Sequence, residues 1–270
     1  MRIEVLGCRG SFPATGADFV RYGGDTASVA VAHDQGEAVL LLDAGTGLRN
    51  LDRTRAFRGT VLLSHWHWDH THGIPFAPQL DHTDAAVTLV APVGHASVRD
   101  TLRQALGPPH FPIRPEQLKG KWEFVAAEEH SVHEEFDVLA LPIPHKGGLT
   151  LGYRIEAGGR SVAYLPDHAL GREPTPEVVE LCRRVDLLIH DGQHLDHEFP
   201  EMAYLGHTTV ERAVRLAELT DAGGLLVFHH DPTRTDDDLD EIAASLPAEA
   251  LMARQGLSLE VTGRVSSGRS

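Results

Sequence analysis

Four side chains that could bind a metal lie within six consecutive residues. They are His65, His67, Asp69 and His70, and they follow an apolar run at 61–63 that is typical of a buried strand. Imidazole and carboxylate groups together suit zinc, manganese or iron. Side chains two residues apart at a strand end leave the same face, so His65 and His67 can share one ion while Asp69 and His70 face a second. A His-rich tract can also bind metal adventitiously or form a solvated loop, but this spacing favours a true metal site.

Three later apolar segments end in residues of the same chemical types. His145, Asp167 and the neighbouring pair of His229 and His230 each follow a strand-like run. Because strands that end at one edge of a sheet direct their terminal residues into one cleft, we expect these side chains to join the first four. Together they predict a two-metal site, in which either His229 or His230 is the last ligand.

The elements that must position these residues follow from hydrophobic periodicity and turn signals. Strands are expected at 2–6, 27–32, 38–42, 61–63, 87–91, 122–126, 136–143, 151–156, 161–165, 186–190 and 225–228. Helices are expected at 97–106, 175–184, 208–220 and 238–245. This order fits an α/β fold of four layers, with helices outside two packed sheets. No linker or internal repeat is evident, so residues 1–270 are expected to form a single domain.

Proline-rich residues 107–115 cannot form a regular helix and predict a loop, a lid or a surface for a second subunit, which allows a homodimer. No run of about 18 apolar residues is present, so no membrane span is expected. The start of the chain reads as a strand rather than a leader, and Cys8 and Cys182 are too few and too scattered for a disulfide framework. A cytoplasmic protein is therefore expected.

The chain carries a formal net charge of −15. Nucleic-acid binding normally shows a basic patch, and the arginines here are scattered, so the charge argues against tRNA or another long nucleic acid as a partner. A small anionic substrate that is drawn in by bound metals remains compatible with this charge.

The motif at 65–70, His-Trp-His-Trp-Asp-His, resembles the His-x-His-x-Asp-His motif of the metallo-β-lactamase superfamily. His145, Asp167 and His229 resemble the remaining ligand motifs of that superfamily, in the same order, so the resemblance covers essentially the whole chain. The segment 7–28, which contains Arg-Tyr-Gly-Gly-Asp-Thr at 21–26, is similar to the branch with ribonuclease Z and the small cyclic-phosphate phosphodiesterases.

This resemblance implies a four-layer αββα metallo-β-lactamase-like sandwich with two divalent metal ions, zinc in the first place and manganese or iron as alternatives. The ligand set that it implies is His65, His67 and His145 for one metal and Asp69, His70 and His229 for the other, with Asp167 bridging the two. Asp43 would orient a ligand through an imidazole N–H, although a turn or helix-capping role explains an aspartate there equally well.

Asp69 and His207 are the candidate catalytic residues. The segment His207-Thr208-Thr209 resembles the His-Ser-Thr motif of the ribonuclease Z branch, whose His assists proton transfer. The alternative is that Thr208 or Thr209 only caps the following helix. Most other histidines are expected to be exposed or structural, and His168 and His110 are the two that most invite a functional role.

Phosphodiester hydrolysis through a metal-bridging hydroxide is the activity expected first. Ribonuclease Z carries a protruding arm for tRNA between the motifs that correspond to His145 and Asp167, whereas only 21 residues, 146–166, separate them here. A small phosphodiester, with cyclic forms included, is therefore expected as substrate. The alternatives are a lactonase or thioesterase on the same metals, a non-catalytic metal-binding regulatory protein, and a diiron redox enzyme, which usually needs a flavin domain that does not fit in this chain.

Overall fold

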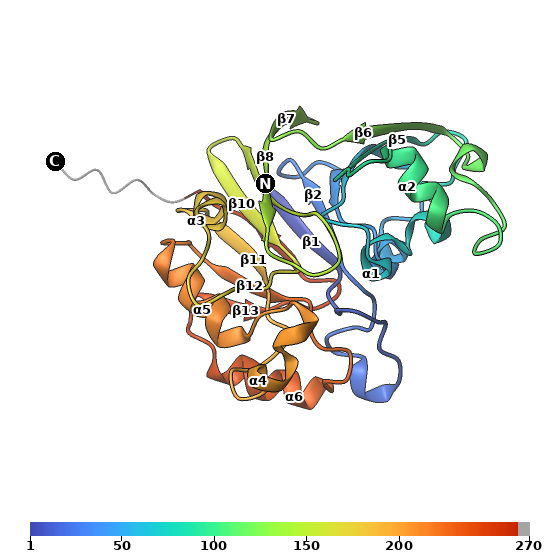
Figure 1. Cartoon of the computed structure of the whole chain (residues 1–270). Helices are drawn as coiled ribbons and strands as arrows, with labels where there is room; N and C mark the ends of the chain where they lie inside the picture. Colours follow the sequence, from blue (N-terminus) through green and yellow to red (C-terminus); the bar gives the residue numbers. More distant parts are fainter. Residues whose placement is uncertain (264–270) are drawn as a thin grey trace.

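Two seven-stranded sheets pack face to face in the computed structural model, which describes residues 1–263 (Figure 1). The first sheet has the order β14-β1-β2-β3-β4-β5-β6. Its strands are β1 (Arg2–Gly7), β2 (Ser28–Ala32), β3 (Ala38–Leu42), β4 (Arg58–Leu62), β5 (Ala86–Ala91), β6 (Lys121–Ala126) and β14 (Ser258–Glu260).

The second sheet has the order β13-β12-β11-β10-β9-β8-β7. Its strands are β7 (His130–His133), β8 (Phe136–Ile143), β9 (Thr150–Ala157), β10 (Arg160–Leu165), β11 (Leu187–Asp191), β12 (Leu225–Phe228) and β13 (Ala250–Met252). In both sheets a run of antiparallel pairs gives way to parallel pairs, at β3–β4 in the first and at β10–β11 in the second. The two sheets therefore repeat one topology, although no repeat is evident in the sequence.

Helices cover the outer faces of both sheets (Figure 1). They are α1 (Trp68–Thr71), α2 (Val98–Ala105), α3 (Pro176–Cys182), α4 (Phe199–Met202), α5 (Val210–Leu219) and α6 (Asp236–Ser245). The helix α2 packs on β5 and β6 of the first sheet, while α3 and α5 pack on the second. The predicted four-layer αββα architecture is confirmed.

Alternation along the strands builds this layering, since successive side chains of a strand point to opposite faces. In β3, Leu40 and Leu42 join the apolar cluster between the two sheets, whereas Leu41 joins the cluster under α2. In β11, Ile189 points inward and Leu188 packs with the helices of the other outer layer. Each sheet is thus buried on both faces, which explains the nearly continuous apolar runs of its parallel strands.

Two predicted helices begin two residues away from their observed starts, while the other two begin one residue later than predicted. The helix expected at 208–220 begins at Val210, because the Thr209 side chain accepts the Arg212 N–H and acts as N-cap. The helix expected at 238–245 begins at Asp236, because Thr235 caps it in the same way and the acidic first turn gives no apolar signal. The short strands β7, β13 and β14 and the helices α1 and α4 were not predicted, since none is long enough to show a period.

No helix among residues 1–263 has the length and apolar character that crossing a bilayer requires.

Candidate metal centre

The candidate ligands lie where strands of the two sheets end. His65 follows β4, His145 follows β8, Asp167 follows β10 and His229 directly follows β12. The short helix α1 then presents Asp69 and its neighbour His70 to the same place. The structure thus brings together all seven residues that the sequence singles out, in two clusters that share one carboxylate.

The first cluster contains His65, His67, His145 and Asp167, whose ligand-type atoms all lie within 4.8 Å of one another. Asp167 Oδ2 lies 3.6 Å from His65 Nε2 and 3.4 Å from His145 Nε2. The same His145 nitrogen lies 3.4 Å from His67 Nδ1. Three imidazole nitrogens and one carboxylate oxygen therefore converge on one point.

The second cluster contains Asp69, His70, Asp167 and His229, and all four are buried. Here the other oxygen of the shared carboxylate is used: Asp167 Oδ1 lies 3.0 Å from His70 Nε2 and 3.1 Å from His229 Nε2. Asp69 Oδ2 lies 3.2 Å from His229 Nε2. Asp167 thus turns one oxygen to each cluster.

The buried atoms of these clusters fit metal ligation better than hydrogen bonding. Within the described residues, His65 Nε2, His70 Nε2 and Asp167 Oδ1 have no hydrogen-bond partner. Burying such atoms without a partner is costly, and nitrogen and carboxylate donors at this spacing suit a divalent cation. Burial is also the main cause that lowers the pKa of His65, His67 and His145, so these imidazoles are neutral near pH 7, the form that binds a metal.

Asp43 orients His70 from behind. Its Oδ2 lies 2.7 Å from His70 Nδ1, and because a carboxylate can only accept, Nδ1 carries the proton and Nε2 faces the cluster. The Asp43 carboxylate also accepts hydrogen bonds from Ser64 N, at 2.7 Å, and from Tyr164 Oη, at 2.9 Å. These donors hold a fully buried carboxylate in one position.

Two further imidazoles are oriented by oxygen acceptors in the same way. His229 Nδ1 donates to Gln193 Oε1 at 3.0 Å, and His145 Nδ1 donates to the Gly206 carbonyl at 2.7 Å. Gly10 lies against the His229 ring, where an added Cβ would come within 2.4 Å of Nδ1. Any larger residue there would displace the ring, so the glycine loop at the start of the chain helps to fix this side chain.

His230, the rival for the last ligand position, lies outside both clusters. Its Nε2 donates to the Ala253 carbonyl at 2.7 Å, and its ring packs edge-on against Tyr22. His229 takes the position in the cluster because it is the first residue after β12 and has a positive φ of 59°, which turns its ring toward Asp167.

His207 stands beside the second cluster, and sequence reasoning missed its partner. Its Nδ1 lies 2.9 Å from Asp191 Oδ2, and its ring stacks on that of His229 with centroids 4.9 Å apart. Burial lowers the pKa of His207, but the Asp191 carboxylate outweighs this effect and raises the pKa to about 9. Asp191 ends the apolar strand β11, which is the signal that identified Asp167, so the same rule could have found it.

The two other histidines of interest lie in different surroundings. His168 is buried next to Asp167, and its Nδ1 lies 2.9 Å from His190 Nε2. His110 lies on the proline-rich loop and lines a cavity next to Trp68.

A cavity of about 390 Å³ gives access to both clusters. Its walls are formed by Ser11, Trp66, His67, Trp68, Asp69, Asp167 and His207. A molecule in this cavity would touch both the shared carboxylate and His207.

A family model described as "Beta-lactamase superfamily domain" matches residues 39–230. This range is most of the chain and contains all seven residues of the two clusters. The chain belongs to the beta-lactamase superfamily. It is a metal-dependent hydrolase, and ribonuclease Z is among its relatives, as the resemblance of the motifs predicted.

Three known proteins match nearly the full length of this superfamily member. Ribonuclease Z from Pyrococcus horikoshii is 24% identical over an alignment of 279 positions, and the match covers 87% of this chain and 90% of the relative. The crystal structure of a diphosphatase from the PhnP family has a TM-score of 0.73 at 21% identity, over 96% of this chain and 97% of the other. Human tRNase Z, short form, has a TM-score of 0.69 at 19% identity, over 97% of this chain and 100% of the other. These two structures support the fold.

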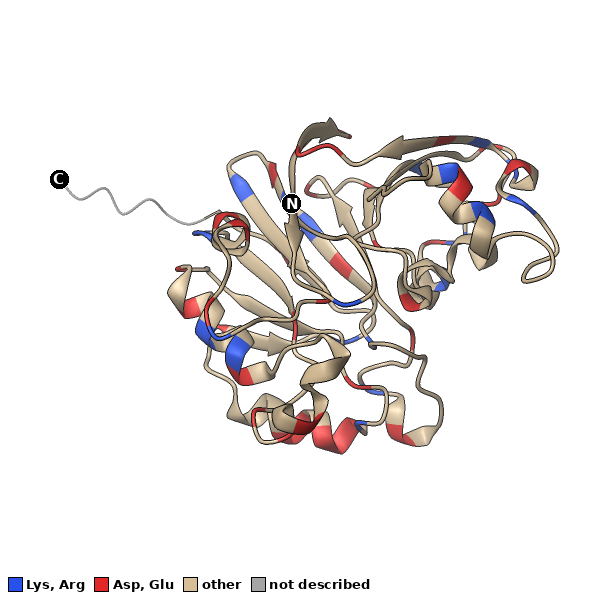
Figure 2. Cartoon of the chain, in the orientation of Figure 1, with Lys and Arg blue, Asp and Glu red and all other residues tan. Residues whose placement is uncertain are grey.

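The expectation that argued against tRNA or another long nucleic acid was wrong, because this superfamily member has ribonuclease Z as a relative over 87% of its length. The net charge misled because it sums the whole surface, whereas contacts with an anion depend on local charge. Figure 2 shows acidic stretches along α6 and basic residues on α5. Residues 146–166 do form only the β9–β10 hairpin. A protruding arm like that of ribonuclease Z affects how RNA is held, but it does not determine which bond the metal centre can cleave.

Proposed function

We propose that this chain is a phosphodiesterase that uses two divalent metal ions, with zinc first and manganese or iron as alternatives. The observation that carries the proposal is the placement of Asp167, whose Oδ2 faces the first cluster and whose Oδ1 faces the second. A single carboxylate with one oxygen toward each ligand set is the arrangement that a bridged pair of ions needs.

When bound, two such ions supply Lewis acidity and lower the pKa of water, so that a nucleophile is available at neutral pH. The chain's own residues provide the frame for this chemistry. Asp167 and Asp69 border the cavity and fix where a scissile phosphate can lie. Asp69 is itself held by the Ser11 N–H, which donates to its Oδ2 at 2.8 Å.

His207 is proposed to donate a proton to the leaving oxygen. It lines the cavity, and Asp191 occupies its Nδ1, so Nε2 is the ring nitrogen left to reach the substrate. Asp191 is in turn held by the backbone N–H groups of His168 and Gln193, at 3.1 and 2.9 Å. This support keeps the imidazole in one orientation, as a general acid requires.

The substrate proposed is a phosphodiester that includes small, also cyclic, forms. The cavity of about 390 Å³ supports this size, since it lies at the lower end of the ~300–1,000 Å³ range of small-molecule sites. The ribonuclease Z relatives support RNA phosphodiesters as a second source of the same bond. We also propose that residues 1–270 act as one hydrolase domain in the cytoplasm, a location supported by the free thiols of Cys8 and Cys182.

A panel of three substrates tests the proposed function. Protein loaded with zinc, and analysed for its metal content, is assayed with bis-p-nitrophenyl phosphate, a lactone and a thioester. We expect turnover of the phosphodiester, loss of that turnover on chelation and its return with zinc. Faster turnover of the lactone or the thioester would overturn the proposal, and so would the absence of turnover of any ester.

The role of His207 is tested by changing the leaving group. His207→Gln should lower kcat by about 100-fold or more for a dialkyl phosphodiester, because its alkoxide needs a proton to leave. The same variant should lose much less with bis-p-nitrophenyl phosphate, since p-nitrophenolate leaves without one. Equal losses on both substrates would show that His207 does not act as the acid.

A further inference from the structure

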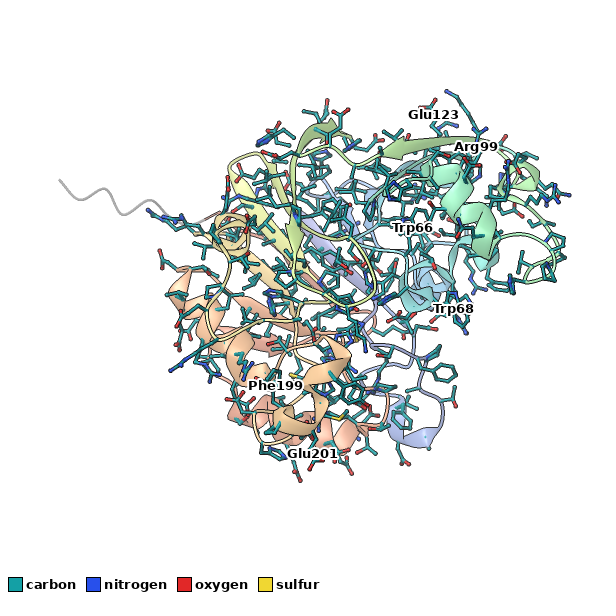
Figure 3. The ribbon with its side chains drawn as sticks, in the orientation of Figure 1. Trp66, Trp68, Arg99, Glu123, Phe199 and Glu201 are labelled. Carbon is teal, nitrogen blue, oxygen red and sulfur yellow. The ribbon has the colours of Figure 1, made fainter. Side chains whose placement is uncertain are left out.

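A second cavity joins the one at the metal clusters. It has a volume of about 640 Å³, and Trp66 and Trp68 belong to the walls of both cavities. Both tryptophans come from the ligand motif itself, Trp66 between His65 and His67 and Trp68 directly before Asp69. Figure 3 shows them close to α1, on the side of the molecule where α2 lies.

The walls of this aromatic cavity carry no Asp, Glu, Lys or Arg. They include Trp66, Trp68, Phe76, Gln104, His110 and Phe111. Phe76 and Phe111 meet edge to face, with centroids 5.6 Å apart. Gln104 and His110 are among the polar groups of a largely apolar wall, a combination that suits a flat heterocycle with a polar edge.

Trp68 offers an open aromatic surface at the junction of the two cavities. Trp68 is 71% exposed, which is uncommon for a tryptophan. Its ring lies parallel to that of His72 within 5°. Trp66 is fixed in place, because its Nε1 donates to the Pro92 carbonyl at 2.8 Å. One indole is therefore held rigid while the other is free to stack with a ligand.

The cavity on the opposite flank has a different character. It has a volume of about 840 Å³, adjoins the metal clusters through His207 and is lined by the charged residues Arg172, Glu173, Arg212 and Arg215. Its charged walls suit an ionic group, and the uncharged aromatic walls suit a neutral ring. The aromatic cavity and the charged cavity would therefore favour one orientation of a bound phosphodiester.

We infer that the aromatic cavity is a subsite for the nucleobase of a nucleotide whose phosphodiester lies at the metal clusters. This inference rests on the proposed phosphodiesterase function and names its substrate class. Bases stack on exposed aromatic side chains whatever their sequence, and such stacking is a large part of nucleotide affinity. The base is the shared chemistry, whether it belongs to a mononucleotide ester or to the end of an RNA chain.

Two esters that release the same p-nitrophenolate separate the subsite from the chemistry. Thymidine 5′-(p-nitrophenyl phosphate) carries a base, and methyl p-nitrophenyl phosphate does not. For Trp68→Ala we expect KM for the thymidine ester to rise by about tenfold or more relative to KM for the methyl ester. Because Trp68 also borders the cavity at the metal clusters, Phe76→Ala serves as a second variant that lines the aromatic cavity alone. It should raise KM for the thymidine ester by a smaller factor and leave kcat/KM for the methyl ester and the zinc content unchanged.

Tyr204→Ala is the matched control, since Tyr204 is 66% exposed and does not line the aromatic cavity. It should leave KM for both esters unchanged. A short single-stranded RNA forms a third arm, and the nucleotide substrate with the lower wild-type KM identifies the source of the base. If both esters are hydrolysed but neither Trp68→Ala nor Phe76→Ala changes KM for any base-containing substrate, the subsite is disproved. If neither ester is hydrolysed, the proposed function itself fails.

Discussion

The two ligand clusters on either side of Asp167 differ in burial and in support. In the second cluster every residue is buried, and His70 and His229 each donate their outer ring nitrogen to a side chain, Asp43 or Gln193. In the first cluster His145 is held by the Gly206 carbonyl and His65 Nδ1 lies 3.0 Å from Ser64 Oγ, but His67 is only partly buried and borders the cavity. Among residues 1–263, no hydrogen-bond partner holds the Nε2 of His67.

This difference indicates that the two clusters have separate roles. Imidazoles that are oriented by hydrogen bonds lose little freedom when they bind a metal, so the buried cluster is organised for tight binding. The cluster that contains His67 can adjust, and it is the one that a substrate in the cavity meets first. We therefore expect the two clusters to bind zinc with different affinities, and the first to be the weaker.

Removing the carboxylate that joins the two clusters should have the largest effect. Asp167→Ala takes away a donor from both, so we expect kcat/KM for bis-p-nitrophenyl phosphate to fall by roughly 1,000-fold or more and less than two zinc ions to be retained per chain. Asp137→Ala, which removes an exposed carboxylate on β8, is the control and should change neither value. An Asp167→Ala protein that keeps two ions and full activity would show that the site is wrongly assigned.

A pair of histidine variants tests the difference between the clusters directly. His70→Ala should weaken the tighter zinc site, and His67→Ala the weaker one. We expect the loss of affinity, measured by competition with a chromogenic chelator, to be at least about tenfold greater for His70→Ala, because this side chain is preorganised by Asp43. Equal losses of zinc affinity in the two variants would show that the buried, hydrogen-bonded cluster and the more open cluster do not differ in how they bind the metal.

The hydrogen bond that Asp43 accepts from His70 should contribute less to zinc affinity than the ligands themselves. In Asp43→Asn one oxygen can still accept, but the amide NH₂ group would face a donor, either Ser64 N at the Oδ1 position or Tyr164 Oη at the Oδ2 position. We expect zinc affinity at the buried cluster to fall by about 10–100-fold and the melting temperature of the zinc-free protein to fall as well. Asp52→Asn, at an exposed turn, is the control. Unchanged zinc affinity in Asp43→Asn would mean that Asp43 only closes the turn after β3.

The sequence anticipated that the candidate ligands meet in one place, because strand ends converge at one edge of a sheet. Each of His145, Asp167 and His229 follows an apolar run, and parallel strands bring such residues to one edge of a sheet whatever lies between them. The sequence favoured His229 over His230 only through the resemblance. The structure adds the physical reason, since the first residue after β12 turns its ring toward Asp167.

Outer contacts were less accessible to sequence reasoning. Asp191 ends β11 and could have been found by the rule that found Asp167, but Gln193 and Tyr164 carry no local signal, because their roles depend on distant residues. The aromatic cavity was also invisible, since Trp68 and Phe111 are brought together only when the proline-rich loop folds against α1 and α2. The substrate argument failed for a related reason, because net charge is a property of the whole chain and not of one surface.

Zinc titration of the metal-free protein tests the two-metal account most directly. Bound zinc and turnover of bis-p-nitrophenyl phosphate are measured in the same samples, from zero to three equivalents. The account predicts two binding steps of different affinity, with little activity at one equivalent and full activity at two. Full activity at one equivalent, or saturation of binding there, would contradict it.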